Sequence, residues 1–176
     1  MSEGPLTAED IRRLFGELAA ELDADGVRAE LFLVGGAAIA LCFDGRRTTR
    51  DLDAVFAPTT AVRQAAAAVA GREGLGPEWL NDAVKGFLPG PDPAAVRYFE
   101  APGLLVDVAS PEYLLAMKLF SSRVEVDADD IALLYRELGF RSVEEGLQLV
   151  ERSYPGRPIA PRVRFLLQEI VASLEN

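Results

Sequence analysis

The sequence contains no histidine and only one cysteine, Cys42, among its 176 residues. The lack of histidine excludes a histidine-based catalytic triad and the usual zinc sites, and one cysteine cannot form an internal disulfide. Any catalysis must therefore use carboxylates, lysine, arginine or hydroxyl groups. We predict that Cys42 and the single tryptophan, Trp79, pack inside the protein.

Long apolar runs are also missing. None reaches the roughly 18 to 20 residues that are needed to span a bilayer. The first residues, "MSEGPLTAEDIRR", are acidic and polar, whereas a signal peptide is basic and then apolar. We therefore expect a cytoplasmic protein that has no contact with a membrane.

Positive charge is scarce, because 18 lysines and arginines stand against 28 aspartates and glutamates, which gives a formal net charge of -10. Binding to a phosphate backbone depends on lysine and arginine, so this balance argues against a protein that coats nucleic acid in general. A local basic patch stays possible. The hydrophobic share of 49% is sufficient for one compact domain or for a domain with a small helical appendage.

The order of the predicted elements indicates an α+β fold. A capping box at Thr7 and Asp10 predicts a first helix that ends before Gly26. Strands are predicted for "AELFLV", "DLDAVFA", "AVRYFEA" and "LLVDVAS", the last two as an antiparallel pair. Further helices are predicted for "AAIALCF" and for residues 60–70, 111–122, 127–138, 143–153 and 162–174, and residues 71–93 are predicted to be irregular. We expect a core of small mixed sheet and helices over residues 1–110, with a helical part over residues 111–176 packed on it.

Asp51 and Asp53 are the first candidates for a functional site. Residues i and i+2 of a strand point the same way, roughly 6.5 to 7 Å apart, so the two carboxylates project as a pair. Such a pair can hold divalent metal for a phosphoryl displacement, and the metal would relieve the repulsion between the two charges. The alternative is a solvated edge strand or turn, which is the commoner meaning of an isolated D-x-D.

Gly35 and Gly36 end the preceding strand. Glycines there let the backbone approach a ligand closely, and the helix that follows offers free N–H groups and its positive dipole end to a phosphate. The alternative is a tight strand-to-helix turn, which is common in any α/β protein.

Taken together, "GGAAIA" and "RRTTRDLD" resemble the nucleotidyltransferase fold of the DNA polymerase beta superfamily, in which two small residues start a helix and a D-x-D follows on the next strand. The chain is most similar to the AbiEii-like toxin nucleotidyltransferases and their uncharacterised relatives. Their arrangement of an arginine, a hydroxyl residue and two aspartates is matched at Arg47, Thr49, Asp51 and Asp53. One departure is Ala37, where the family usually has a serine or threonine whose hydroxyl would hold a terminal phosphate.

Two later segments, "LLAMKL" and "RVEVDADDIALL", are similar to the lysine motif and the R…D..D motif of the same group. The resemblance implies nucleotide binding by Gly35, Gly36, Ala37, Arg47, Thr49, Asp127 and Asp130. It also implies that Lys118 contacts the phosphates, whereas a lysine among apolar residues more often extends to solvent. For the later motif the alternatives are an ion pair between Arg123 and Asp127 and a plain helix cap formed by Asp127 and Asp130.

Asp107, in "LLVDVAS", is the candidate for the third carboxylate that polymerase-beta-like sites carry on another strand. There it would ligate metal with Asp51 and Asp53 and accept the proton of the attacking hydroxyl. The alternative is an aspartate at a strand end that bonds a nearby backbone amide.

The sequence thus predicts an enzyme that uses Mg²⁺ or Mn²⁺ to transfer a nucleoside monophosphate from a nucleoside triphosphate to an acceptor hydroxyl on RNA or protein. The resemblance implies a place in a toxin–antitoxin or phage-defence system, with a cognate antitoxin or another partner protein. The second candidate function is a nucleotide-binding or protein-binding module that keeps the fold without transfer. Ala37 favours the module, and the set of aspartates favours the enzyme.

Overall fold

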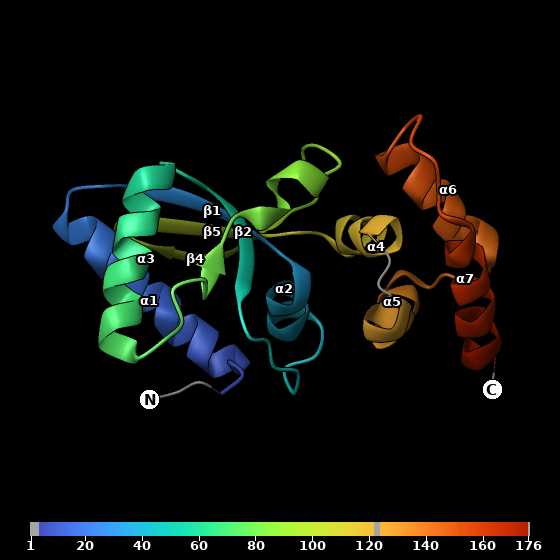
Figure 1. The fold of residues 1–176 in the computed structure, drawn as a ribbon, viewed down its shortest axis with the longest axis horizontal. Helices are drawn as coiled ribbons and strands as arrows, with labels where there is room; N and C mark the ends of the chain where they lie inside the picture. The colour runs from blue at the N-terminus through green and yellow to red at the C-terminus, as the bar shows by residue number, and fades with distance from the viewer. Residues whose placement is uncertain (1–3, 122–123, 176) are drawn as a thin grey trace. The chain divides into compact units, whose positions relative to one another are not determined.

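The computed structural model describes residues 4–121 and 124–175, which form two compact units. The first unit runs up to Gly86 and includes Ala94–Ala109, and the second consists of Phe87–Pro93 together with the chain from Ser110 onward. Helices and one mixed sheet make up the described chain (Figure 1), which confirms the α+β class. No helix within the described ranges combines the length and the apolarity that a membrane-spanning segment needs.

The first unit is built on a five-stranded sheet in the order β3-β2-β1-β5-β4. β1 is central and runs antiparallel to β2 and parallel to β5, while β4 and β5 form the predicted antiparallel pair. The strands are β1 (Ala29–Val34), β2 (Leu52–Ala57), β3 (Leu80–Asn81), β4 (Val96–Ala101) and β5 (Leu104–Val108).

Alternation along these strands gives the sheet one apolar face. Leu31 and Leu33 of β1 lie opposite Phe56 and Ala54 of β2, and all four side chains are buried. This face packs against α1 (Ala8–Ala24) and α3 (Thr59–Glu73), which lie side by side in Figure 1. The capping box predicted for the start of α1 is present. α2 (Gly35–Cys42) follows β1 directly and contacts both β1 and β2.

Residues 71–93 are more ordered than the sequence predicts. They contain the end of α3, the two-residue strand β3 and a 3₁₀ helix, η1 (Ala83–Phe87). The Trp79 indole N–H donates to the Ala66 carbonyl at 3.0 Å, and the Leu52 N–H donates to the Trp79 carbonyl at 2.7 Å. A strand of two residues has no periodicity to detect, so only these tertiary contacts define it.

The second unit is helical, with α4 (Pro111–Ser121), α5 (Val124–Leu138), α6 (Val143–Ser153) and α7 (Pro161–Leu174). The Ser110 hydroxyl accepts from the Tyr113 N–H at 3.3 Å, which confirms Ser110 as the N-cap of α4. The Asp92 carboxylate accepts from the Ser110 N–H at 2.7 Å, and the Tyr113 hydroxyl donates to the Gly90 carbonyl. These bonds attach Phe87–Pro93, which the sequence assigns to the core, to this unit.

Candidate active site

The face of the sheet opposite α1 and α3 carries two of the predicted carboxylates. Asp53 pairs with Val34 in the β2–β1 register, and Asp107 pairs with Phe32 in the β5–β1 register. Phe32 and Val34 are two residues apart on β1 and point the same way, as do paired residues on neighbouring strands. Asp53 and Asp107 therefore project from one face, which we call the acidic face.

The start of α2 lies directly against the β2 end of the acidic face. Gly35 has a φ of +69°, and a Cβ built on it would lie 3.0 Å from Asp53 Oδ2. A Cβ on Gly36 would lie 3.3 Å from Thr49 Oγ1. Only glycine accommodates both the backbone angle and the approach of Asp53, so the turn that the sequence predicts here also brings Asp53 and Thr49 close to the first two residues of α2.

Asp51 directly precedes β2, and its position is fixed by a short backbone network. The Leu6 N–H donates to the Thr49 carbonyl at 2.6 Å, and the Thr49 N–H returns a bond to the Leu6 carbonyl at 3.0 Å. The Thr49 hydroxyl then donates to the Asp51 carbonyl at 2.9 Å. Asp51 is exposed, whereas Asp53 is half-buried. Sequence reasoning missed Leu6, because one isolated bridge leaves no pattern.

Asp107 is separated from Asp53 by the whole of β1. Two strand spacings amount to about 10 Å, and the two residues are also offset by two positions along β1. The Asp107 carboxylate accepts a short bond from Arg97 Nε, its partner on β4. The structure therefore gathers Asp53 with Thr49 at the start of α2, but it does not bring Asp107 to them.

The donor chemistry of Asp51 and Asp53 fits a hard divalent cation. Mg²⁺ in proteins is commonly held by one or two carboxylates and completed by substrate phosphates and water. Among the residues that the structure describes, no three His, Cys, Asp or Glu side chains are grouped so that they could hold a metal ion by themselves. The metal role of all three aspartates stays a prediction, and so does the pairing of Asp51 with Asp53, because β2 begins at Leu52 and Asp51 lies before it.

Asn81 is a neighbour of this site that sequence reasoning missed. It pairs with Asp53 in the parallel β2–β3 register and so projects from the acidic face beside it. Its amide Nδ2 donates to the Glu78 carbonyl at 3.4 Å, and its Oδ1 accepts from the Ala83 N–H at 3.2 Å. Its only sequence signal is an asparagine in a turn-rich segment, which is too common to be informative.

The arginines that precede Asp51 lie in the loop after α2. Arg47 Nε is 3.6 Å from Asp44 Oδ2, and its side chain is about one-third exposed. Arg46 is almost fully exposed, and its backbone N–H donates to the Asp44 carboxylate, which lowers the pKa of that aspartate. Phosphate binding by Arg47 stays a prediction.

Ala37 and Cys42 occupy α2 in different environments. Ala37 is 1% exposed, so its methyl group is shielded from solvent. Cys42, the last residue of α2, is exposed, so the prediction that it packs inside is wrong, whereas Trp79 is buried as predicted. Residues 39–41 in the same last turn are buried, and the pattern of an eight-residue helix does not specify that its final side chain is exposed.

Lys118 forms a compact charged cluster inside the second unit. Its ammonium Nζ lies 2.7 Å from Asp127 Oδ1 and 2.9 Å from Asp130 Oδ2, and the three side chains are only 12–14% exposed. α5 begins at Val124, so Asp127 lies inside the helix and the helix-cap interpretation is wrong. The interpretation that Lys118 extends to solvent is also wrong, because its ammonium contacts Asp127 and Asp130 and its side chain is largely buried. Arg123 lies outside the described residues, and nucleotide binding by the cluster stays a prediction.

Comparisons with protein-family models, with curated proteins and with solved structures found no match to this chain. The assignment to the nucleotidyltransferase fold therefore stays a prediction that depends on the motifs quoted above.

The contact between Gly35 and Asp53 can be tested with one pair of variants. Gly35→Ala is expected to destabilise the protein by about 1–2 kcal/mol from its backbone angle alone and also to displace the Asp53 carboxylate. Gly26→Ala is the matched control, because Gly26 has a φ of +67° and nothing within 4 Å of its Cβ position. We expect both variants to lose similar amounts of unfolding free energy, because both glycines have a positive φ. Only Gly35→Ala should also lose Mg²⁺-dependent nucleotide binding, measured by calorimetry. Equal binding by both variants would contradict the placement of Asp53.

Proposed function

We propose that this chain is a metal-dependent nucleotidyltransferase that acts in the cytoplasm. The observation that carries the proposal is the approach of Asp53 and Thr49 to Gly35 and Gly36 at the start of α2, with Asp51 two residues before Asp53. Carboxylates beside the positive end of a helix suit a ligand that is both phosphorylated and metal-bound. By its motif resemblance, the protein would serve in a toxin–antitoxin or phage-defence system together with a partner protein.

In this proposal the first amides of α2 and Arg47 bind the triphosphate, and Asp51 and Asp53 hold Mg²⁺ or Mn²⁺. The metal supplies charge stabilisation at the α-phosphate and the leaving pyrophosphate. The oxygen of the acceptor hydroxyl forms a bond to the α-phosphorus, and the bond from that phosphorus to pyrophosphate breaks. The hydroxyl proton passes to a carboxylate. The sequence predicts this role for Asp107, but the structure places Asp107 two strand spacings from Asp53 and pairs it with Arg97, so the proton acceptor is not assigned to it.

The second candidate is a nucleotide-binding or protein-binding module without transfer. Two observations favour it: Ala37 lacks the hydroxyl of the family motif, and the neighbour of Asp53 on β3 is the amide Asn81, where a carboxylate could have joined the pair. Only turnover separates the transferase from a nucleotide-binding module, whereas a protein-binding module need not bind nucleotide.

Incubation with each α-labelled nucleoside triphosphate, Mg²⁺, and either total RNA or lysate protein tests the proposal. Label is expected to enter one of the two pools, together with release of one pyrophosphate for each label transferred. Addition of a chelator in excess of Mg²⁺ should abolish the transfer. Metal-dependent nucleotide binding without any transfer would favour the nucleotide-binding module, and no nucleotide binding would overturn the transferase and favour a protein-binding module.

A further inference from the structure

A pocket of about 490 Å³ opens beside Asp51 in the first unit. The N-terminal segment Gly4–Leu6 lines it on one side, Arg50 and Asp51 line it at the start of β2, and the segment from Leu75 to Trp79 lines it on the other side. Its volume is within the roughly 300–1,000 Å³ of ordinary ligand sites. Since the pocket shares Asp51 with the proposed metal pair, a group bound in it would lie next to the proposed site of transfer.

The wall formed by Gly76–Trp79 is a fixed turn. The Trp79 N–H donates to the Gly76 carbonyl at 3.2 Å across Pro77 and Glu78, and proline favours the second position of such a turn. The buried Trp79 indole is bonded to Ala66 of α3, and the Trp79 carbonyl is bonded to Leu52 of β2. This wall is therefore attached both to α3 and to β2, the strand that carries Asp53.

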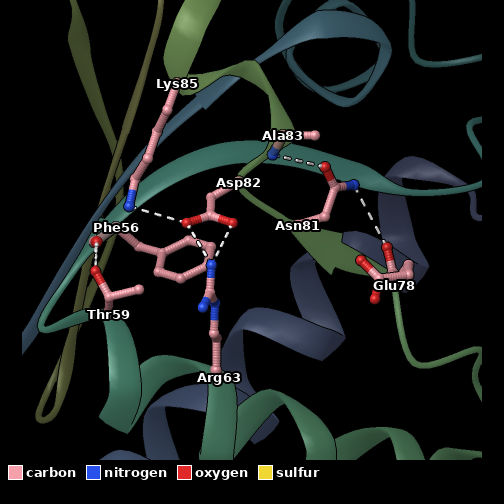
Figure 2. A network of polar contacts seen from close by, with 8 residues as sticks. All are labelled: Phe56, Thr59, Arg63, Glu78, Asn81, Asp82, Ala83 and Lys85. Carbon is pink, nitrogen blue, oxygen red and sulfur yellow. Dashed lines mark hydrogen bonds and ion pairs between the residues drawn. The ribbon is translucent and has the colours of Figure 1, made fainter.

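A second set of contacts, drawn in Figure 2, holds the chain that leaves this wall. Asn81 bonds the Glu78 carbonyl on one side and the Ala83 N–H on the other. Asp82 accepts two bonds from Arg63 of α3, at 2.8 and 3.0 Å, and its carboxylate lies 2.9 Å from Lys85 Nζ. These contacts lower the pKa of Asp82, so the carboxylate stays charged and the attachment persists at neutral pH.

The charges that line the pocket offer little to a polyanionic acceptor. With Asp51 assigned to the metal, the remaining lining charges are one carboxylate, that of Glu78, and one guanidinium, that of Arg50, and the whole chain carries a net charge of -10. A nucleic acid would bring one negative charge for each nucleotide to a pocket that offers a single cation. A neutral or positively charged group meets no such repulsion.

We propose that this pocket is the acceptor subsite, and that it takes a hydroxyl group carried next to a positive charge, as in a serine, threonine or tyrosine of a basic polypeptide segment. This inference rests on the proposed transferase function, and it specifies the acceptor, which that proposal does not identify. The hydroxyl oxygen would form its bond to the α-phosphorus from the pocket side of Asp51, with pyrophosphate as the leaving group and the proton passing to a carboxylate.

Gly76→Leu is designed to fill the pocket without disturbing its wall. Gly76 is exposed, has no unusual φ, and has nothing within 4 Å of its Cβ position, so a larger side chain can extend from it without a clash. Gly71→Leu is the matched control, because Gly71 is an exposed residue of α3 with the same free space and does not line the pocket. The probes are synthetic peptides with one serine, threonine or tyrosine between lysines, the same peptides between glutamates, and total RNA, each with labelled nucleoside triphosphate and Mg²⁺.

We expect the full chain to label the lysine-flanked peptides. Gly76→Leu should lower that labelling at least tenfold while its nucleotide binding stays equal to that of Gly71→Leu. Glu78→Gln should raise KM for the lysine-flanked peptides by about threefold, as expected for one exposed charge pair, and leave nucleotide binding unchanged. Labelling of RNA in preference to peptide, equal labelling by Gly76→Leu and Gly71→Leu, or nucleotide binding without labelling of any peptide would each overturn the acceptor assignment. Absence of nucleotide binding in the unaltered chain would instead overturn the transferase proposal on which it rests.

Discussion

Replacement of both Asp51 and Asp53 by asparagine is expected to abolish Mg²⁺-dependent nucleotide binding and to lower any transfer roughly a thousandfold or more, because the charges that hold the metal are removed. Asparagine has nearly the same shape as aspartate, Asp51 is exposed, and the substitution removes two like charges from one strand end. The unfolding midpoint should therefore change little. Calorimetry with a non-hydrolysable triphosphate, with and without Mg²⁺, measures the binding.

The matched control is the double replacement of Asp23 and Asp25 by asparagine. These exposed aspartates at the end of α1 have the same spacing, and their replacement changes the net charge by the same amount. This control should bind nucleotide as the unaltered chain does, which separates a local metal site from a general effect of charge. Unchanged metal-dependent binding in the Asp51 and Asp53 variant would show that the metal, if one binds, is held elsewhere.

Replacement of Lys118 by methionine is expected to destabilise the second unit by about 3–5 kcal/mol. Methionine has a similar length and no charge, so the carboxylates of Asp127 and Asp130, each about one-eighth exposed, lose the Lys118 ammonium. Stability is lost for two reasons: the attraction to Lys118 is removed, and two partly desolvated like charges remain three residues apart on one helix. Denaturant unfolding followed by circular dichroism measures it.

Lys85→Met is the matched control for Lys118→Met. Lys85 also lies beside an aspartate, Asp82, but its side chain is 45% exposed and Asp82 keeps its two bonds to Arg63. This change should cost less than about 1 kcal/mol. Addition of Asp127→Asn and Asp130→Asn to Lys118→Met should restore much of the stability, since the two like charges that Lys118 compensated are then gone. A cost for Lys118→Met no larger than that for Lys85→Met would show that the cluster is not desolvated in solution.

The stability result bears on the proposed role of Lys118. An ammonium has three donors, and in Lys118 two of them are directed to carboxylates that already compensate its charge, so a phosphate would have to compete with Asp127 and Asp130 for it. If Lys118→Met unfolds the second unit, a loss of activity in that variant does not identify a phosphate contact. Lys118→Arg, which keeps the cation, is then the variant in which nucleotide affinity can be compared at equal stability.

Local chemistry in the sequence was sufficient for most of the fold. Thr7 and Asp10 define the start of α1 because a capping box is completed within four residues, and the Gly35 and Gly36 turn follows from the end of an apolar strand. The antiparallel pair β4 and β5 follows from two alternating runs joined by "PG". These features depend on residues close in the chain, so their pattern is visible in it.

Only the tertiary structure decided which side chains meet. The sequence identified Asp51, Asp53 and Asp107 as one group, but strand order places β1 between Asp53 and Asp107, and the side chain beside Asp53 on β3 is that of Asn81. Strand order depends on burial summed over the whole sheet, and no local pattern encodes it. The partners of Lys118 show the same limit. Asp127 would cap α5 if the helix began there, but α5 begins at Val124, and Asp127 inside the helix pairs with Lys118. The residue at which α5 begins depends on its packing against α4, which local sequence does not encode.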